Sequence, residues 1–509
     1  MLAKVLSFGL VGIEAFPIEI EIDVSRGLPA ITLVGLADTT IRESRERVKS
    51  AIKNSGFVWP AERITINLAP SDIKKEGACF DLAIALGILA ATQQLHPDTL
   101  RGFFITGELS LDGTLRPSQG ILPMCLALSR SETKNIVLPY QNAKEAALVC
   151  EANIFALKTL KETVEFLHNP QLKKPFTQDP GAFFQRNLPY PVDFSEIKGQ
   201  YLAKRAIEVA VAGRHNILMI GPPGSGKTML AKRIPTIMPD MTLEEALEIT
   251  KIHSVAGTSP LQGVIALRPF RFPHHTISDI AMVGGGSWPR PGEISLAHQG
   301  VLFLDEFAEF RRSCLEAMRQ PLEDGRVCVS RVHRSNEFPA EFMLVAAMNP
   351  CPCGYYTDPR KACRCNPGKI AGYLGKISGP LLDRIDIHIE LSAINYKELT
   401  DTKDTEPSCA IKARVEKART VQRERFTQEG IFYNAQMNTR QIKKYCPLED
   451  EARELLKIAM TELGFSARAY DKILKVSRTI ADVAGSANIN KGHLSEAIQY
   501  RSLDRDFFA

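Results

Sequence analysis

A glycine-rich segment between an apolar run and a helix-forming run constrains the fold of this chain more than any other feature. The apolar run is Ile217–Ile220, and the segment itself consists of Gly221, Pro222, Pro223, Gly224, Ser225, Gly226, Lys227 and Thr228. Glycines let backbone N–H groups converge on phosphate oxygens, a lysine reaches the β and γ oxygens, and a threonine hydroxyl ligates Mg²⁺. The pattern predicts a strand, a phosphate-binding loop and a helix, and therefore an α/β domain that binds a nucleoside triphosphate.

Length and composition set the broad class. A chain of 509 residues is too long for one hydrophobic core, so two or three domains are expected. Lys and Arg number 63 against 58 Asp and Glu, so a nucleic-acid surface would have to be a local concentration of charge. The start of the chain is interrupted at Ser7 and Gly9 and favours a first strand over a signal sequence. No apolar run reaches the roughly 18 residues that cross a bilayer, which predicts a cytoplasmic enzyme without a membrane partner.

The pattern along the chain predicts three domains and a linker. Residues 1–169 alternate strand-like and helix-like stretches, residues 170–194 are a proline-rich linker, residues 195–400 form the phosphate-binding core, and residues 401–509 form a helical lid. The elements predicted before the linker span 18–24, 31–34, 40–55, 64–68, 82–91 and 102–106. The strands predicted in the core span 216–220, 301–304, 342–348 and 385–389. This order predicts an α/β protein with a parallel sheet in its core.

Polar side chains end two further apolar runs of the core. Asp305 and Glu306 follow the run 301–304, and Asn349 follows the run 342–348. Asp305 is predicted to bind Mg²⁺ together with Thr228, Glu306 to polarise the attacking water, and Asn349 to orient that water. A capping or turn role before Pro350 is the alternative for Asn349.

With these motifs, the chain resembles the magnesium-chelatase-like branch of the AAA+ ATPases. The segment 378–386 is similar to the arginine-finger region of that branch, and the segment 466–471 resembles its second-sensor motif. The resemblance implies that Arg384 reaches the γ-phosphate bound by a neighbouring subunit, and that Arg468 contacts the nucleotide in its own subunit, with Arg478 as the competing choice. An ion pair of Arg384 with Asp383 or Asp386 is the alternative. A finger supplied in trans implies a ring, a homohexamer.

Longer segments resemble the ComM/YifB family of competence-related ATPases over nearly the whole chain. The matching segments are 199–200, 203–208, 268–276, 284–286 and 291–298. The resemblance implies a Lon-protease-like (S5-type) N-terminal α/β domain, an AAA+ core, and ATP and Mg²⁺ as cofactors. It also implies ATP-driven DNA unwinding and branch migration during homologous recombination in natural transformation, with single-stranded and branched DNA and a recombinase as partners.

Basic side chains gather on two segments that are predicted to bind DNA. Residues 324–336 alternate apolar and polar before a basic tip, which predicts a hairpin. Arginines on such a hairpin can neutralise phosphates as DNA passes through a ring, although solvated basic loops without this role are common. The predicted DNA-binding residues are Arg326, Arg331, His333 and Arg334 of the hairpin, and Arg268 and Arg271 of the second segment.

Four of the 11 cysteines form two Cys-x-Cys pairs with nine residues between them. The residues are Cys351, Cys353, Cys363 and Cys365. Four thiolates can close a tetrahedral Zn²⁺ site that leaves no position for water, so the loop 351–365 is predicted to hold a structural zinc ion. Two pairs of reduced thiols are the alternative.

The first domain and the overall function leave alternatives open. Cys79 falls where Lon-type proteases carry their nucleophile, but Leu122 stands where the resemblance expects the partner lysine, which argues against proteolysis. A magnesium-chelatase motor subunit is the second candidate function, and an ATP-dependent protease or chaperone is the third.

Overall fold

The computed structural model describes residues 1–35, 39–71, 75, 77–149, 151–178, 190–258, 263–286, 289–331, 334–356, 358–393, 405–501 and 503. The chain divides into two compact units. Unit 1 comprises Met1–Asn187 and Thr242–Ala266, and unit 2 comprises Leu188–Met241 and Leu267–Ala509.

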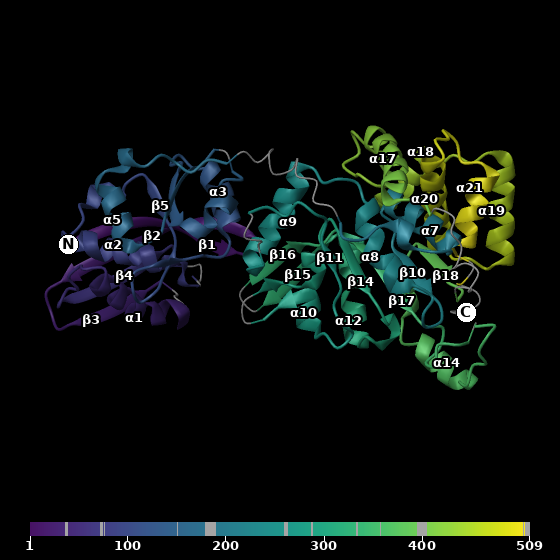
Figure 1. Cartoon of the computed structure of the whole chain (residues 1–509), viewed down its shortest axis with the longest axis horizontal. Coiled ribbons are helices and arrows are strands. Elements are labelled where there is room, and N and C mark those ends of the chain that lie inside the picture. Colours follow the sequence, from purple (N-terminus) through teal and green to yellow (C-terminus); the bar gives the residue numbers. More distant parts are fainter. Residues whose placement is uncertain are drawn as a thin grey trace. The chain divides into compact units, whose positions relative to one another are not determined.

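Unit 1 is built on a seven-stranded mixed sheet (Figure 1). Its strand order is β3 (Ala30–Val34), β4 (Arg63–Ala69), β2 (Glu14–Ser25), β1 (Leu2–Val11), β5 (Phe103–Ile105), β8 (Asn135–Pro139) and β9 (Asn153–Leu157). β2 is antiparallel to both of its neighbours, and the other pairs are parallel. Alternate residues of β2, among them Ile18, Ile20 and Ile22, are fully buried. This period of two places one face of the strand on the core.

Helices cover the sheet of unit 1. They are α1 (Thr39–Asn54), α2 (Asp81–Ala91), α3 (Ile121–Ser129), α4 (Ala143–Ala146) and α5 (Leu160–His168). Every residue of α2 is buried, as expected of a helix that is apolar on all sides. A Cβ at Gly87 of α2 would lie 2.2 Å from Ile22 Cδ1, so glycine allows the helix to approach β2 closely. All six elements predicted before the linker are confirmed as helices or strands.

One helix of unit 1 comes from far along the chain. α9 (Leu243–Ala256) begins with a capping box formed by Thr242 and Glu245. It packs on α3 of unit 1, and the Ser254 carbonyl accepts the Gly120 N–H at 3.2 Å. Residues 242–266 fall inside the range predicted for the core, whereas the structure groups them with unit 1.

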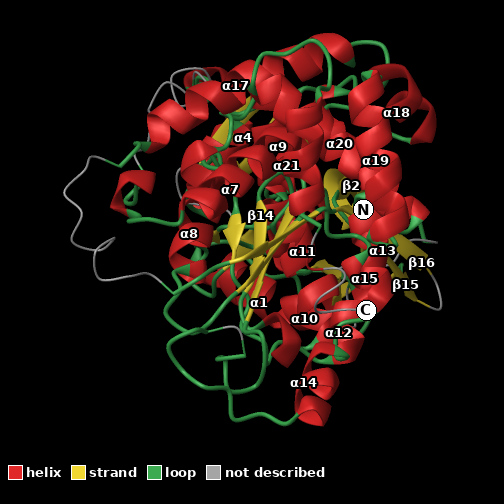
Figure 2. Ribbon diagram, turned by 90° about the vertical axis from the view of Figure 1, so that its right-hand side faces the viewer, coloured by secondary structure: helices red, strands yellow, loops and turns green. Residues whose placement is uncertain are grey.

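Unit 2 contains a five-stranded parallel sheet, which confirms the predicted α/β class and parallel core. Its order is β11 (Phe270–Arg271), β14 (Val301–Leu304), β17 (Met343–Met348), β10 (Ile217–Ile220) and β18 (Ile387–Glu390). Every residue of β10, β14 and β17 is buried, as expected of a parallel sheet covered on both faces. Helix α7 (Tyr201–Gly213) packs on β18, and α8 (Lys227–Ile237) packs on β14 and β17 (Figure 2).

The remaining described elements of unit 2 complete its core. Short helices and a hairpin lie in the connections between the strands of the sheet: α10 (Asp279–Val283), α11 (Glu293–Leu296), α12 (Arg312–Ala317), α13 (Arg319–Asp324), β15 (Arg326–Arg331), β16 (Arg334–Pro339), α14 (Pro367–Leu374) and α15 (Gly379–Leu382). The chain ends in α17 (Ser408–Arg425), α18 (Thr439–Tyr445), α19 (Asp450–Glu462), α20 (Ala467–Val483) and α21 (Lys491–Gln499). α17 and α20 pack on α7, so these C-terminal helices share one hydrophobic core with the sheet.

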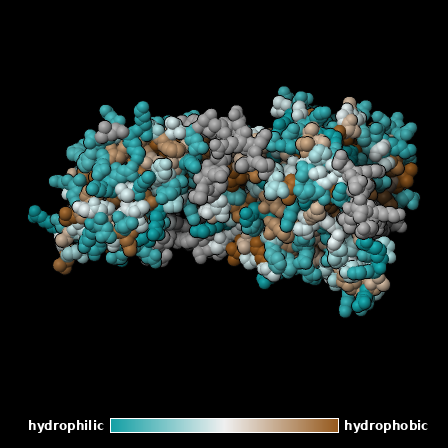
Figure 3. Space-filling view, viewed as in Figure 1, coloured by the Kyte–Doolittle hydropathy of each residue, from teal (hydrophilic) through white to brown (hydrophobic). Residues whose placement is uncertain are grey.

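Part of the predicted linker lies outside the described residues. Residues 179–189 are not described, whereas Pro170–Leu172 forms one 3₁₀ turn and Phe176 bridges to Ile154 of β9. No helix in the described part of the chain is both long and apolar enough to span a membrane. Hydrophilic residues cover most of the face of each unit shown in Figure 3.

Candidate active site

The glycine-rich loop joins β10 to α8, as predicted. Gly224 and Gly226 have φ of +80° and +91°, a backbone conformation that side chains with a Cβ rarely adopt. A Cβ at Gly221 would lie 2.5 Å from the Leu391 carbonyl oxygen, so glycine is required there for close packing. The loop therefore leads its N–H groups into the amino end of α8, where the helix dipole favours an anion.

Lys227 is held inside this loop. Its ammonium group donates to the carbonyls of Gly221 and Pro222 at 2.7 and 3.0 Å, and to Asn349 Oδ1 at 3.3 Å. Burial of the ammonium lowers the pKa of Lys227 to about 8, against an opposing effect of the Asp305 charge. The contact also brings Asn349, at the carboxyl end of β17, to the phosphate-binding loop.

The two predicted magnesium ligands meet at the end of β14. The Thr228 hydroxyl donates to Asp305 Oδ2 at 2.6 Å. A hydroxyl and a carboxylate are oxygen ligands of the kind that Mg²⁺ takes beside substrate phosphates. These residues therefore fit an Mg²⁺ ion bound with ATP.

Glu306 has an unusual backbone and a partner that the sequence did not reveal. Its φ is +53°, a conformation that residues other than glycine rarely adopt, and its side chain is 55% exposed. His275 Nδ1 lies 2.8 Å from Glu306 Oε2, so a proton on that nitrogen is donated to the carboxylate. His275 follows β11, the strand beside β14, and can therefore position the carboxylate. No sequence pattern indicated β11, because the strand has only two residues.

The three arginines considered for the nucleotide lie in different settings. Arg384 is 12% exposed, pairs with Glu323 and donates to the Pro380 carbonyl, so neither Asp383 nor Asp386 is its partner. Arg468 is 64% exposed, with Asp383 Oδ2 at 3.4 Å. Arg478 is buried and donates to Asp482 and to two carbonyls of the following loop. Arg468 is therefore the more accessible of the two sensor candidates.

The predicted hairpin is confirmed as β15 and β16, whose last paired residues are Arg331 and Arg334. His333, the third basic residue predicted for this hairpin to bind DNA, lies outside the described residues, as do the side chains of these two arginines. Arg326 at the base is exposed and pairs with Glu337 at 3.3 Å.

The second basic segment is more deeply placed than its sequence suggests. Arg268 is buried and donates to the carbonyls of Pro239, Asp240 and Gln299. Arg271 forms two 2.6 Å hydrogen bonds with the Glu293 carboxylate. Both guanidinium groups thus bond within unit 2, and their contact with DNA remains a prediction.

The four cysteines converge, which makes the cluster compatible with zinc. Their sulfur atoms all lie within 4.8 Å of one another, and Cys351 Sγ is 3.3 Å from Cys353 Sγ and 3.7 Å from Cys363 Sγ. A tetrahedral Zn²⁺ with Zn–S bonds of about 2.3 Å would require sulfur separations of about 3.8 Å. Backbone N–H groups that donate to its sulfur lower the pKa of Cys353 to about 6, which favours a thiolate there, whereas burial and the neighbouring sulfur atoms raise the pKa of Cys363 and of Cys365.

The cysteine loop touches the phosphate-binding loop. A Cβ at Gly354 would lie 2.6 Å from Pro223 Cδ, and Gly354 has a φ of +84°. The cysteine loop therefore packs closely against Pro223 of the phosphate-binding loop.

In unit 1, the residues considered for proteolysis are engaged in the fold. The Cys79 carbonyl accepts the Gly107 N–H at 2.8 Å. Leu122 is fully buried in α3, and its N–H donates to Glu145. An apolar, buried side chain at this position cannot accept the proton of a nucleophile.

Three family models match this chain. The model described as magnesium chelatase, subunit ChlI, matches residues 193–399, the model of subunit ChlI of Mg-chelatase matches residues 20–142, and the subunit ChlI C-terminal model matches residues 405–501. The chain is thus similar to magnesium-chelatase subunits in both units, including the segments that carry the glycine-rich loop and the cysteine cluster.

Relatives that match over nearly the whole length of the chain identify its family more specifically than the family models do. The competence protein ComM of Haemophilus influenzae is 45% identical over 510 residues, which cover 99% of this chain and 98% of that protein. YifB, an uncharacterized protein of Escherichia coli, is 43% identical over 496 residues, 97% of this chain and 96% of that protein. A shorter match of 176 residues, 31% of each chain, is 27% identical to Lon protease 2 of Bacillus subtilis.

The chain belongs to the ComM/YifB family of magnesium-chelatase-like proteins. Membership suggests an AAA+ ATPase, with ATP and Mg²⁺ as its cofactors, and a connection with competence. The residues around the glycine-rich loop agree with this class, since a lysine, the two predicted magnesium ligands and a carboxylate meet at one edge of the sheet.

Proposed function

We propose that this protein is an ATP-driven DNA motor of the cytoplasm that acts as a homohexameric ring. It binds single-stranded and branched DNA, drives DNA unwinding and branch migration, and promotes integration of incoming DNA by homologous recombination, beside a recombinase, in natural transformation. The observation that carries the ATPase part is the contact between Thr228 and Asp305, which supports a magnesium site beside Lys227 of the phosphate-binding loop. The DNA part draws on the competence protein at 45% identity and on the basic hairpin β15–β16.

In this proposal the residues have separate roles. Asp305 and Thr228 hold Mg²⁺, Glu306 polarises the attacking water, and Asn349 orients it. Arg468 contacts the nucleotide in its own subunit from the C-terminal helices, which act as a lid. Arg384 reaches the γ-phosphate of the neighbouring subunit, where a planar, permanently charged group stabilises the charge that develops. To reach that phosphate, Arg384 would break its ion pair with Glu323.

A zinc ion bound by the four cysteines is part of the same proposal. A closed Cys₄ site contributes folding energy and leaves no coordination position for a substrate. Since Gly354 packs on Pro223, the zinc loop would stiffen the phosphate-binding loop. In this proposal, the Lon-like N-terminal domain supports the ring or guides DNA, and it has no proteolytic activity.

Stimulation of ATP hydrolysis by DNA tests the proposal. We expect single-stranded and three-stranded branched DNA to raise the hydrolysis rate of the wild type. The Glu306→Gln variant should bind ATP and assemble without turnover. Hydrolysis that no DNA changes, in a protein that responds to a porphyrin substrate, would favour the magnesium-chelatase alternative.

A second experiment tests the hairpin. We expect the double variant Arg331→Ala, Arg334→Ala to lose DNA binding and unwinding while keeping its basal ATP hydrolysis. The salt dependence of a DNA pull-down should become shallower, since fewer phosphates are neutralised. Unchanged binding and unwinding would refute the hairpin role.

A further inference from the structure

A second cluster of basic side chains lies in unit 2, at the end of the sheet opposite the phosphate-binding loop. Met343 begins β17, Gln299 lies two residues before β14, and Arg214 follows α7 shortly before β10. These are the amino ends of parallel strands, whereas the phosphate-binding loop and Asp305 follow the carboxyl ends. The cluster is therefore distinct from the proposed ATP site.

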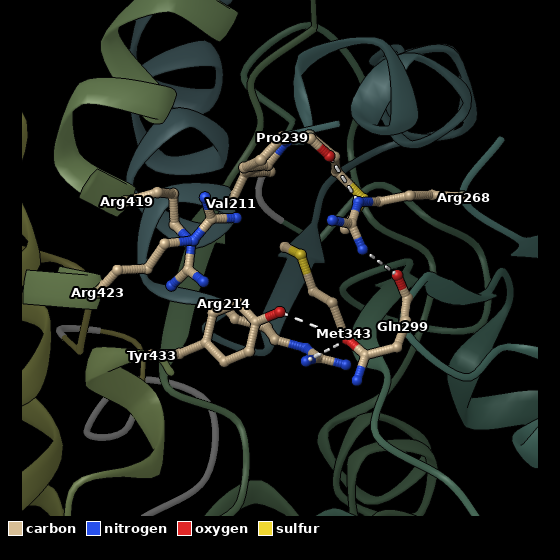
Figure 4. A pocket seen from close by; sticks show the side chains of 10 residues that line it. Val211, Arg214, Pro239, Arg268, Gln299, Met343, Arg419, Arg423 and Tyr433 are labelled. Carbon is tan, nitrogen blue, oxygen red and sulfur yellow. Dashed lines mark hydrogen bonds between the residues drawn. The ribbon is translucent and has the colours of Figure 1, made fainter. Parts of the chain in front are cut away.

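Four arginines line a pocket in this place (Figure 4), and none of the described residues that line it carries a carboxylate. The lining residues are Val211, Arg214, Met238, Pro239, Arg268, Gln299, Met343, Arg419, Arg423 and Tyr433. Arg419 and Arg423 are four residues apart on α17, and they face Arg268 across the pocket. The four guanidinium groups are permanently charged. The pocket therefore carries an excess of positive charge.

Arg419 is a buried cation at the base of this pocket. It is 4% exposed, and its guanidinium lies 3.7 Å from the centre of the Tyr433 ring. One of its nitrogens donates to Gln422 and to the Phe432 carbonyl, while its Nε has no hydrogen-bond partner. Burial, reinforced by the neighbouring guanidinium charges, lowers the pKa of Arg419 to about 10. A buried charge without an opposite charge is costly, and an anion would remove that cost.

Of the other three arginines, two are held in place by hydrogen bonds and one is exposed to solvent. Arg214 lies 4.5 Å from the centre of the same Tyr433 ring and bonds to Gln299 and Glu341, while Arg268 bonds to three carbonyls. Arg423 is exposed, one helical turn after Arg419. It therefore stands at the mouth of the pocket, where a ligand can reach it from solvent.

We propose that these four arginines form a second anion site, which takes one phosphate group of a nucleotide or of a nucleic-acid backbone. The cavity is narrow, with a volume of about 10 Å³ for the centre of a water-sized sphere, which holds one water molecule. A phosphate would thus enter with its leading oxygens between Arg419 and Arg268, and Arg423 would close over the rest. Guanidinium groups suit this ligand because they bind phosphate oxygens in pairs. The proposed anion site does not depend on the proposed function in DNA unwinding and branch migration.

Counting bound pyrophosphate tests the site in the full-length protein. In equilibrium dialysis without nucleotide, the wild type should bind two pyrophosphates per chain, one at the glycine-rich loop and one at the arginines. Lys227→Ala should lose the first and keep the second. Arg423→Glu should weaken the second by about tenfold or more, since it reverses a charge at the mouth of the pocket.

Lys417→Glu is the matched control. Lys417 is exposed on the same helix, outside the pocket, so this charge reversal should leave both pyrophosphates bound. Arg419→Gln gives a second variant that removes the buried charge. A single pyrophosphate in the wild type, or the same loss in the Arg423 and Lys417 variants, would overturn the proposal.

Competition identifies the source of the phosphate. If ADP displaces both pyrophosphates, the second site takes a nucleotide. If ADP displaces one and a single-stranded oligonucleotide displaces the other, the second site takes a nucleic-acid phosphate. If neither displaces the second, it takes free phosphate, and the proposed nucleotide and backbone ligands are both wrong.

Discussion

Nucleotide affinity should fall as the pH rises above about 8, because Lys227 loses its proton in the empty loop. The pKa of Lys227 is about 8 there, lowered by burial from the ordinary value of about 10.4. Bound phosphates carry negative charge next to this ammonium group, so they raise its pKa again. Below pH 8 the charged lysine is already present when the nucleotide binds. Above pH 8 the lysine must first take up a proton, and binding weakens.

The magnitude follows from the fraction of lysine that is charged. At pH 9, one unit above the pKa, about one tenth of the empty sites hold a charged Lys227, so the apparent dissociation constant should be about tenfold higher than at pH 7. A tenfold change corresponds to about 1.4 kcal/mol. Phosphate groups, with a second pKa of about 6, are already ionised over this range and add no further change.

Calorimetric titration of Mg·ADP at pH 7, 8 and 9 measures this effect. At pH 9, titrations in buffers with different ionisation heats should show uptake of about 0.9 proton per nucleotide. Lys227→Arg is the control, since a guanidinium group stays charged at these pH values and its affinity should not change with pH. An affinity that is constant from pH 7 to pH 9, without proton uptake, would refute the assigned role of burial.

The remaining predictions concern Glu306, the subunit interface and the cysteines. His275→Ala should lower kcat by about tenfold at unchanged ATP affinity, because Glu306 loses the imidazole at 2.8 Å, while His274→Ala, which alters the exposed neighbour, should not. Equal rates for both variants in steady-state hydrolysis would exclude a positioning role. Glu306→Gln and Arg384→Ala should each be inactive, yet an equal mixture should regain about a quarter of wild-type hydrolysis if the finger acts in trans, since about a quarter of random interfaces combine an intact Glu306 with an intact Arg384. A mixture that stays inactive would assign Arg384 to its own subunit. Metal analysis should find about one zinc per chain, and removal of the metal, followed by return of Mg²⁺, should lower ATP affinity several-fold. Cys353→Ser should lower ATP affinity in the same way, and Cys409→Ser should not. A metal-free protein with unaltered ATP affinity would contradict the zinc proposal.

The sequence could predict those features that depend on neighbouring residues. The strands β10, β14 and β17 are apolar runs, followed by the glycine-rich loop after β10 and by polar residues after β14 and β17, and parallel strands bring such ends to one edge. The contacts of Lys227 with Asn349 and of Thr228 with Asp305 follow from that geometry. The hairpin β15–β16 was predictable because its alternation has a period of two.

Other features depend on the tertiary fold, so no local pattern reveals them. His275 reaches Glu306 only because β11 lies beside β14. Arg268 belongs to a basic segment, yet three carbonyls surround its guanidinium. The arginine pocket combines residues from positions 214, 268, 419 and 423, which no spacing in the sequence connects.

The membership of α9 in unit 1 affects the order in which the protein can fold during synthesis. The ribosome completes most of unit 1 within the first 187 residues, but Ala246, Ile249 and Ile252, which are fully buried on α9, emerge only after β10 and α8 of unit 2. Domains near the N-terminus ordinarily fold first as independent units. In this chain, unit 1 cannot complete its packing until residue 256 has left the ribosome, because the apolar surface of α3 stays uncovered until α9 is available. The nucleotide-binding loop is therefore synthesised before the first unit is closed.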